Sequence, residues 1–144
     1  MLWSSCLPEV GPLLGDASVD AGLAAPCDGG ACVDSCTGYA GCVTFVDATD
    51  NPSLREVKFG QNGNQYDPPC LRIRLGQTVT FFGGHFDSHP IQQGCGPAAV
   101  ITSTQDGNTR TFTFAQALGT YGYYCSAHGS AAGSGMAGAI EVVR

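Results

Sequence analysis

The chain has 144 residues, a length that suits one domain with a single hydrophobic core. Only 12% of the residues are charged and 21 are glycine, a balance that with frequent Thr, Val and Phe favours an all-β protein. The sequence offers no apolar run of the roughly 18 residues needed to span a membrane. It has no basic stripe that could neutralise nucleic-acid phosphates, so nucleic acid is excluded as a partner.

The acidic charge is concentrated at the front of the chain. Residues 1–54 contain seven acidic residues and no Lys or Arg, whereas residues 55–144 contain five acidic and six basic residues. The net charge of −6 therefore belongs to the first part of the chain. We interpret this part as a solvated acidic extension; the alternative is a surface that steers the protein toward a basic partner.

The first 42 residues are predicted to form an irregular extension. Residues 1–26 show neither helical nor strand periodicity and are interpreted as a tether. The cysteines of residues 27–42 are spaced unlike the paired knuckles of structural zinc sites, so a disulfide-stapled loop is favoured over a metal cluster. We therefore divide the chain into an acidic, Gly/Ala/Cys-rich segment (1–42) and a folded domain (43–144).

Eight cysteines in a chain of this length indicate an oxidising compartment. If Cys125 is a metal ligand and Cys6 is separate, three disulfides can form, in any of the 15 pairings that six cysteines allow. Those six are Cys27, Cys32, Cys36, Cys42, Cys70 and Cys95. Cys6 follows a short segment that resembles the end of a bacterial lipoprotein signal, which makes it a candidate for lipidation. The alternatives are a disulfide or a free thiol, and the sequence as given holds no complete signal peptide.

Short segments of alternating polar and apolar residues follow from residue 56 onward. The pattern predicts strands at 56–59, 71–75, 78–82, 98–103, 109–114, 121–125 and 139–143. Turn residues such as Asn62-Gly63-Asn64 and Asp67-Pro68-Pro69 separate them. One short helix is predicted at 115–118. Many short strands without a long helix indicate a sandwich or barrel of two packed sheets.

Four side chains that bind soft metals occur in the second half of the chain. Cys125 and His128 are three residues apart, Met136 follows after seven intervening residues, and His89 lies upstream. Two imidazoles, one thiolate and one distant thioether form the ligand set of blue-copper electron-transfer sites. A lone Cys-x-x-His pair would be weak evidence, but the four residue types in this order are specific.

Residues 43–144 resemble the cupredoxin family, which contains plastocyanin, azurin and amicyanin. The resemblance is carried by Gly119-Thr-Tyr-Gly-Tyr-Tyr-Cys125-Ser-Ala-His128 with Gly135-Met136, and by the strand–turn–strand at 71–81. It implies a Greek-key β-sandwich of two sheets and one type 1 copper ion per chain. The implied ligands are His89, Cys125, His128 and Met136. It further implies that His128 passes the electron at an apolar patch formed with Met136 and nearby Ala and Gly residues.

Two positions depart from the family pattern. The residue after the first histidine is often Asn, whose side chain ties the ligand loops together, but here it is Pro90. The tie must then come from elsewhere, with Ser88 as a candidate. The interval between His128 and Met136 is longer than is common in small members of the family, and its residues 129–134 suggest flexibility. A long or absent contact from the Met136 thioether is therefore the alternative to a bond.

Each ligand has an alternative interpretation. His85 lies four residues before His89 and could take its place. Cys125 could be part of a disulfide, His89 could be a turn residue, and Met136 could serve only in core packing. Tyr124 is expected to pack in a strand next to Cys125.

The resemblance implies a small, monomeric electron carrier that cycles between Cu(I) and Cu(II), with no substrate of its own. Its partners would be redox proteins such as cytochromes or copper oxidoreductases. Three histidines are too few for the additional centres of multicopper enzymes. Periplasmic copper delivery and a metal-free binding module remain as alternatives. We expect a periplasmic or extracellular protein, tethered to the outer side of a membrane if Cys6 carries lipid.

Overall fold

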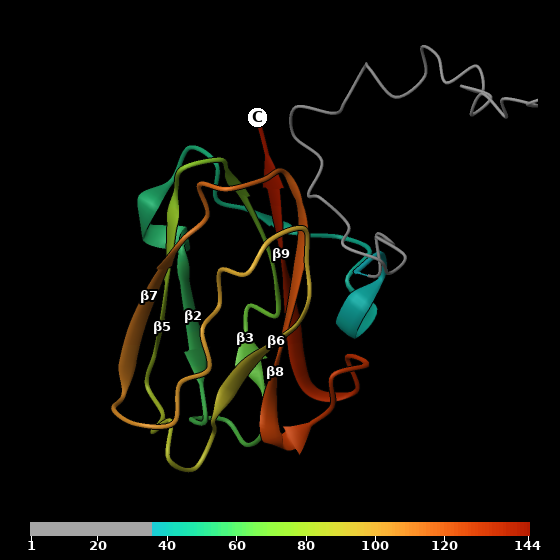
Figure 1. Cartoon of the computed structure of the whole chain (residues 1–144). Helices are drawn as coiled ribbons and strands as arrows, with labels where there is room; N and C mark the ends of the chain where they lie inside the picture. Colours follow the sequence, from blue (N-terminus) through green and yellow to red (C-terminus); the bar gives the residue numbers. More distant parts are fainter. Residues whose placement is uncertain (1–35) are drawn as a thin grey trace, which may run out of the picture.

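The computed structural model describes residues 36–144, which form two β-sheets packed face to face (Figure 1). The first sheet has the strand order β1-β4-β9-β8-β6, with β1 (Val46–Asp47), β4 (Cys70–Arg74), β9 (Gly135–Val143), β8 (Gly119–Gly129) and β6 (Ile91–Cys95). The second sheet has the order β3-β2-β5-β7, with β3 (Tyr66–Asp67), β2 (Glu56–Phe59), β5 (Thr78–Phe82) and β7 (Thr109–Thr113). Two short 3-10 helices, η1 (Tyr39–Gly41) and η2 (Pro52–Leu54), complete the described elements. The predicted all-β sandwich of two sheets is confirmed.

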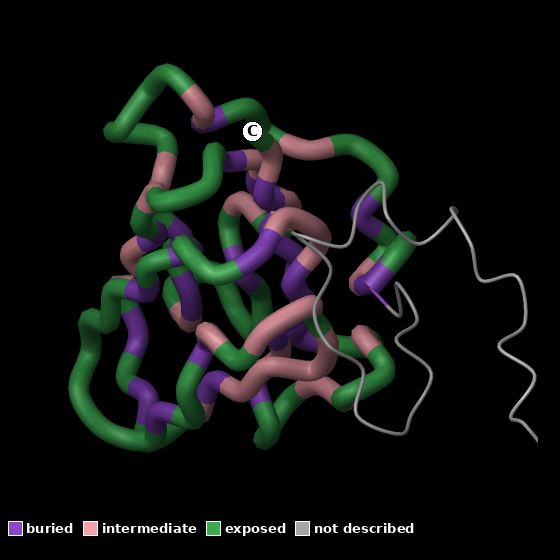
Figure 2. Tube along the Cα trace, turned by 45° about the horizontal axis from the view of Figure 1, so that its top comes forward, coloured by how far each residue is buried: buried purple, intermediate pink, exposed green. Residues whose placement is uncertain are grey.

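Strand alternation builds the core between the sheets. In β2 and β5, every second residue is buried, which places Val57 and Phe59 beside Val79 and Phe81. Leu71 and Ile73 of β4 are fully buried on the facing sheet. Figure 2 shows buried stretches of the chain in purple towards the inside and exposed outer loops in green. The two inner faces together form one apolar core, as expected for packed sheets.

The pairing of strands places the ligand-bearing segments at one end of the sandwich. β4 and β9 are parallel neighbours, and β8 runs antiparallel to both β9 and β6. The end of β8, the start of β9 and the start of β6 therefore meet at the same end. The turn between β4 and β5 lies at the opposite end, because Arg74 at the end of β4 pairs with Val143 at the end of β9.

Six of the seven predicted strands are confirmed, with ends that differ by a few residues in some of them. The predicted strand at 98–103 is wrong: these residues form no named strand, and the backbone N–H groups of Val100 and Ile101 donate to the side-chain oxygen of Gln93. The sequence did not predict β6, which pairs with β8. The predicted helix at 115–118 is also wrong, because no helix forms there.

Two disulfides attach the segment Cys36–Cys42 to the first sheet. Cys36 is bonded to Cys95 at the end of β6, and Cys42 is bonded to Cys70 at the start of β4. These pairs fall within the predicted set of cysteines, of which Cys27 and Cys32 lie outside the described residues. Cys6 and the predicted tether also lie outside them, and the division at residues 42 and 43 stays a prediction.

None of the helices in the described part of the chain is long and apolar enough to cross a membrane.

Candidate metal centre

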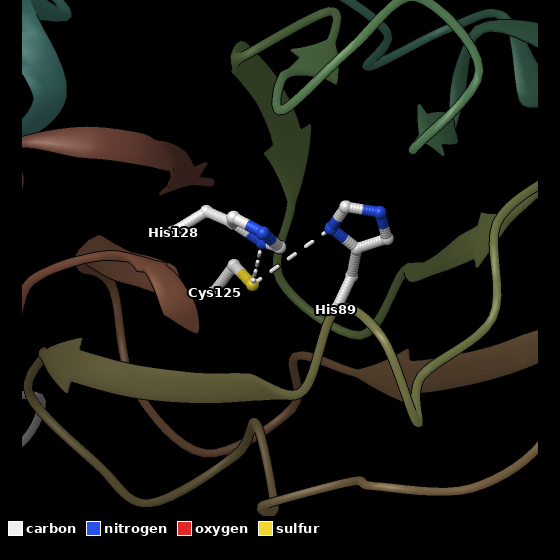
Figure 3. A group of neighbouring side chains, drawn as sticks. All are labelled: His89, Cys125 and His128. Atoms are coloured by element: carbon white, nitrogen blue, oxygen red, sulfur yellow. Dashed lines mark hydrogen bonds between the residues drawn. The ribbon is translucent and has the colours of Figure 1, made fainter.

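Three of the four predicted ligands converge at the end of the sandwich where β6 begins (Figure 3). His89 lies in the loop between β5 and β6, two residues before Ile91. Cys125 and His128 lie in the last part of β8. The donor atoms of the three side chains all lie within 4.8 Å of one another. Segments that are 36 residues apart in the sequence are thus brought to one point.

Both imidazoles direct the same ring nitrogen toward the cysteine sulfur. Sγ of Cys125 lies 3.5 Å from Nδ1 of His128 and 4.0 Å from Nδ1 of His89. Figure 3 shows both rings beside the sulfur, each joined to it by a dashed line. Donor atoms that share one ion at about 2.0–2.3 Å each are separated by similar distances, roughly 3.5–4 Å in a trigonal arrangement. The three donors therefore fit a single small ion.

The pairing of β8 with β9 is irregular at the ligand residues. Tyr124 pairs with Ala137 and Gly129 pairs with Gly135, so four residues of β8 lie opposite Met136 alone. The four residues are 125–128, which contain both Cys125 and His128. A bulge of this kind releases side chains from strict alternation and turns them toward a common point. It also places Met136, the fourth predicted ligand, directly across from the other two on the neighbouring strand.

Met136 is buried within the core rather than exposed at the surface. Its side chain is 1% exposed and belongs to the same apolar cluster as Cys125 and Ile91. The expected apolar patch around His128 therefore cannot include it, because a fully packed side chain offers no surface to a partner. The exposed residues next to His128 are Ser126 and Ala127.

The two ligand loops are tied by backbone atoms. The N–H of Ser126 donates to the carbonyl oxygen of Pro90 at 2.9 Å, which joins the residue after Cys125 to the residue after His89. The expectation that Ser88 provides this tie is wrong, because its hydroxyl donates to the neighbouring Asp87 carboxylate at 3.1 Å. A proline can fill this position because only its carbonyl is needed, and proline lacks just the N–H.

The ring of His89 packs against two consecutive residues, Phe59 and Gly60. The ring lies edge-on to Phe59, with ring centroids 6.2 Å apart. Gly60 lies so close that a Cβ there would be 3.0 Å from the His89 ring. Burial, reinforced by the nearby His128, lowers the pKa of His89. The neutral imidazole that metal binding requires is therefore favoured.

The rival histidine is not part of this group. His85 is exposed, and its carbonyl oxygen accepts hydrogen bonds from the backbone N–H groups of Ser88 and His89. Its role in the structure is to shape the turn that carries His89. The close packing by Gly60 and the Ser126–Pro90 bond were not predicted, since a single glycine or proline gives no sign of which distant residue it contacts.

The interval between His128 and Met136 is a hydrogen-bonded hairpin turn. The N–H of Ser130 donates to the carbonyl of Ser134 at 3.0 Å, and the N–H of Gly133 donates to the carbonyl of Ser130 at 2.9 Å. The hydroxyls of Ser130 and Ser134 are 2.7 Å apart. The expected flexible insertion thus has a defined conformation, which we call the ligand hairpin (residues 129–135).

Comparison with known proteins gives the family. Residues 55–143 match the family described as copper binding proteins, plastocyanin/azurin family. This match covers more than half of the chain, and the chain belongs to this cupredoxin family. Copper is thus the cofactor of the protein. The buried thiolate and the two imidazoles of the site suit copper, because a soft thiolate ligand stabilises Cu(I) and imidazole binds both oxidation states.

Individual relatives share about a quarter to a third of their residues with the chain. A chloroplastic plastocyanin of Oryza sativa subsp. indica is 31% identical over 100 residues, which are 61% of this chain and 62% of that protein. A purple cupredoxin from Nitrosopumilus maritimus is 23% identical, with a TM-score of 0.46, over 61% of this chain and 98% of that one. A pseudoazurin from Sinorhizobium meliloti is 27% identical, with a TM-score of 0.43, over 62% of this chain and 72% of that one. The matched region thus spans less than two thirds of the plastocyanin.

Proposed function

We propose that this protein is a small electron carrier in which His89, Cys125, His128 and Met136 hold one type 1 copper ion. The observation that carries the proposal is the convergence of a buried cysteine and two histidines at one end of the sandwich. When bound, copper supplies a one-electron couple that a thiolate and two neutral imidazoles stabilise in both oxidation states.

The protein contributes a site that changes little when an electron arrives. Cys125 is fully buried, so its sulfur is shielded from water and from other thiols. The Ser126–Pro90 hydrogen bond holds the two ligand loops at a fixed separation. Such supporting contacts around the ligands fix their orientation and tune the metal. Met136, buried opposite residues 125–128, would supply the fourth and weaker ligand.

His128 is the proposed exit for the electron. It is the exposed member of the three clustered ligands, whereas Cys125 is buried and His89 is half-buried. A partner that docks at this end of the sandwich therefore meets the imidazole of His128 first. The proposed partners are small redox proteins, and the chain itself turns over no substrate.

The two disulfides support a location outside the reducing cytosol, because such bonds persist in oxidising compartments. We propose a periplasmic or extracellular protein that acts as a monomer. Lipidation of Cys6, which would tether it to a membrane, stays a prediction.

Stopped-flow electron transfer tests this function. The copper-loaded, reduced protein is mixed with an oxidised c-type cytochrome, alongside the variants His128→Ala and His85→Ala. We expect a second-order reaction that is unchanged in His85→Ala and falls at least about tenfold in His128→Ala, since even outer partners of a metal ligand contribute that much. His85 is the matched control because it is exposed and lies outside the ligand group.

Two results would contradict the proposal. An unchanged rate in His128→Ala would remove its role as the exit ligand. A wild-type protein that reduces no redox protein, but transfers its copper to a metal-free acceptor, would be a copper-delivery protein instead.

A further inference from the structure

The segment Cys36–Cys42 places one aromatic ring against the sheet that carries the ligands. Tyr39 is 5% exposed, although it belongs to a segment of only a few residues beside the sandwich. In Figure 1 this segment lies along the outer side of β9. Burial, with the nearby Tyr124, raises the pKa of its phenol to about 12. The ring is therefore a packed, neutral group rather than a surface side chain.

Three glycines form the cavity that this ring fills. A Cβ at Gly122 of β8 would lie 2.7 Å from the ring, and a Cβ at Gly94 of β6 would overlap the hydroxyl. A Cβ at Gly133, in the ligand hairpin, would lie 3.1 Å from the ring and 2.8 Å from the backbone nitrogen of Ala40. Glycine at each position allows the backbone to approach the ring closely. The ring of Tyr39 thus touches β6, which follows the loop that carries His89, and β8, which carries Cys125 and His128. It also touches the ligand hairpin, which joins His128 to Met136.

The position of the ring is fixed covalently on both sides. Cys36 is bonded to Cys95, whose strand begins two residues after His89, and Cys42 is bonded to Cys70. The backbone N–H of Gly122 also lies 3.2 Å from the Cys36 sulfur. Ala40 next to the ring has a left-handed conformation (φ 56°), which a non-glycine residue keeps only where its surroundings impose it.

The ligand hairpin packs against this ring, while the carbonyl oxygen of its Ala131 lies near Gly94 of β6. Besides the packing of Gly133, the Tyr39 hydroxyl donates to the carbonyl of Ser130 at 3.4 Å. The hairpin joins His128 directly to Met136, so a displacement of its turn moves the backbone on both sides. A long turn has more conformations to lose than a short one, and a packed contact reduces that number.

We propose that Tyr39 is a positioning residue for the copper centre. Through the ligand hairpin it sets the separation of His128 and Met136, and the two disulfides hold it in place. This inference rests on the proposed function, because it takes these two residues as ligands. The contact acts mainly through the ring, since the hydroxyl bond is long.

Hydrogen exchange of the copper-free protein tests the contact itself. The amides of Ser130 and Gly133 report the hairpin, because both donate within it. We expect Tyr39→Ala to speed their exchange by at least about tenfold, and Tyr39→Phe to leave it close to wild type. Phe112→Ala is the matched control: Phe112 is also 5% exposed, but it lies on β7 in the other sheet. Phe112→Ala should lower the free energy of unfolding. It should not speed the hydrogen exchange of the Ser130 and Gly133 amides more than that of other amides.

A second pair of variants tests the same contact from the hairpin side. Gly133→Ala adds a methyl group toward Tyr39, whereas Gly76→Ala adds one at a similar φ (89° against 86°) with no atom within 4 Å. Gly76 lies at the opposite end of the sandwich, so both variants carry the same backbone strain and only one reaches the hairpin. This pair keeps the test valid if Tyr39→Ala does not fold.

The spectrum of the Cu(II)-loaded variants tests the consequence for the site. A type 1 site is expected to show an intense blue thiolate-to-copper band and a second band at higher energy, whose ratio reports how strongly Met136 bonds. We expect Tyr39→Ala and Gly133→Ala to change this ratio, and Tyr39→Phe, Phe112→Ala and Gly76→Ala to leave it as in the wild type. Unchanged exchange and unchanged band ratio in both Tyr39→Ala and Gly133→Ala would overturn the proposal. Faster exchange with an unchanged band ratio would also overturn it, because the ring would then act on the hairpin alone. A wild-type protein without these bands would instead refute the copper ligands, whatever the exchange result.

Discussion

Cys125 differs from the other cysteines of the described residues because it forms no disulfide. Its sulfur is buried and lies close to two imidazole nitrogens, while four other cysteines form two disulfides that attach residues 36–42 to the same sheet. A thiol that must bind a metal is kept out of reach of disulfide exchange by burial.

Gly60 provides a test of how tightly the site is held. A Cβ at Gly60 would lie 3.0 Å from the ring of His89, at a position whose φ of 69° already disfavours other residues. We expect Gly60→Ala to displace the imidazole and to weaken copper binding by about 10–100-fold, the range seen when supporting contacts of a metal ligand are lost. Copper affinity measured by competition with a chelator checks this.

Gly63→Ala is the control for this variant. Gly63 has a φ of 86° in the same loop, but no atom lies within 4 Å of its Cβ position. It should carry the backbone strain without the loss of affinity. Equal affinities for the two variants would show that His89 is not held by this contact.

The residue types of the site could be predicted from the sequence, but the contacts between them could not. The order of His89, Cys125, His128 and Met136 was sufficient to predict where the site lies, and the structure brings the first three together. The choice between His85 and His89 required the turn in which the His85 carbonyl supports the His89 amide. The tie made by Pro90 is a backbone bond, which side-chain chemistry does not reveal.

At the scale of elements, the alternation of polar and apolar residues predicted the strands that bury one face. β5 was predicted with its observed ends because Thr78–Phe82 alternates regularly. β6 was missed because Ile91-Gln-Gln-Gly-Cys95 shows no such alternation; its residues after Ile91 are all half-buried. The apolar segment at 98–103 looked like a strand, but the side chain of Gln93 satisfies its backbone groups. An amide side chain therefore replaces a sheet partner there.

The disulfide Cys42–Cys70 gives a prediction for this scale. It closes a loop with a sequence separation of 28, and the double variant Cys42→Ser, Cys70→Ser should lower the free energy of unfolding by about 2–4 kcal/mol. The midpoint of urea unfolding of the copper-free protein measures the loss. Because Tyr39 remains attached through Cys36–Cys95, the ligand hairpin should be less affected than in Tyr39→Ala. A midpoint equal to that of the wild type would mean that the segment contributes no constraint.

The disulfide pairing was not predictable from the sequence. Six cysteines allow 15 pairings, and the observed ones depend on which strands the segment Cys36–Cys42 lies against in the folded protein. Since the position of Tyr39 depends on those bonds, its contact with the ligand hairpin required the folded structure.

For the whole molecule, four buried tyrosines predict a loss of stability in alkali. Burial raises the pKa of Tyr39, Tyr66, Tyr121 and Tyr123 above the usual 10.0. The folded protein therefore keeps these protons above pH 10, where the unfolded chain releases them. Their contribution is fully present below pH 10 and is lost as the pH rises toward the raised values. The midpoint of urea unfolding should fall steadily above pH 10.

Tyr66→Phe separates this effect from general damage by alkali. The hydroxyl of Tyr66 is buried without a hydrogen-bond partner, so its removal breaks no bond. We expect a variant that is at least as stable as the wild type at neutral pH, with a shallower decline above pH 10. An identical decline would show that Tyr66 does not contribute to it.

The most direct test of the account is the visible absorption spectrum of the Cu(II)-loaded protein before and after ascorbate is added. The site predicts an intense blue thiolate-to-copper band at one copper per chain, which ascorbate bleaches and reoxidation restores. The band should be absent from Cys125→Ser, which keeps the shape of the side chain but removes the thiolate. A protein that binds no copper, or a band that persists in Cys125→Ser, would contradict the proposed centre.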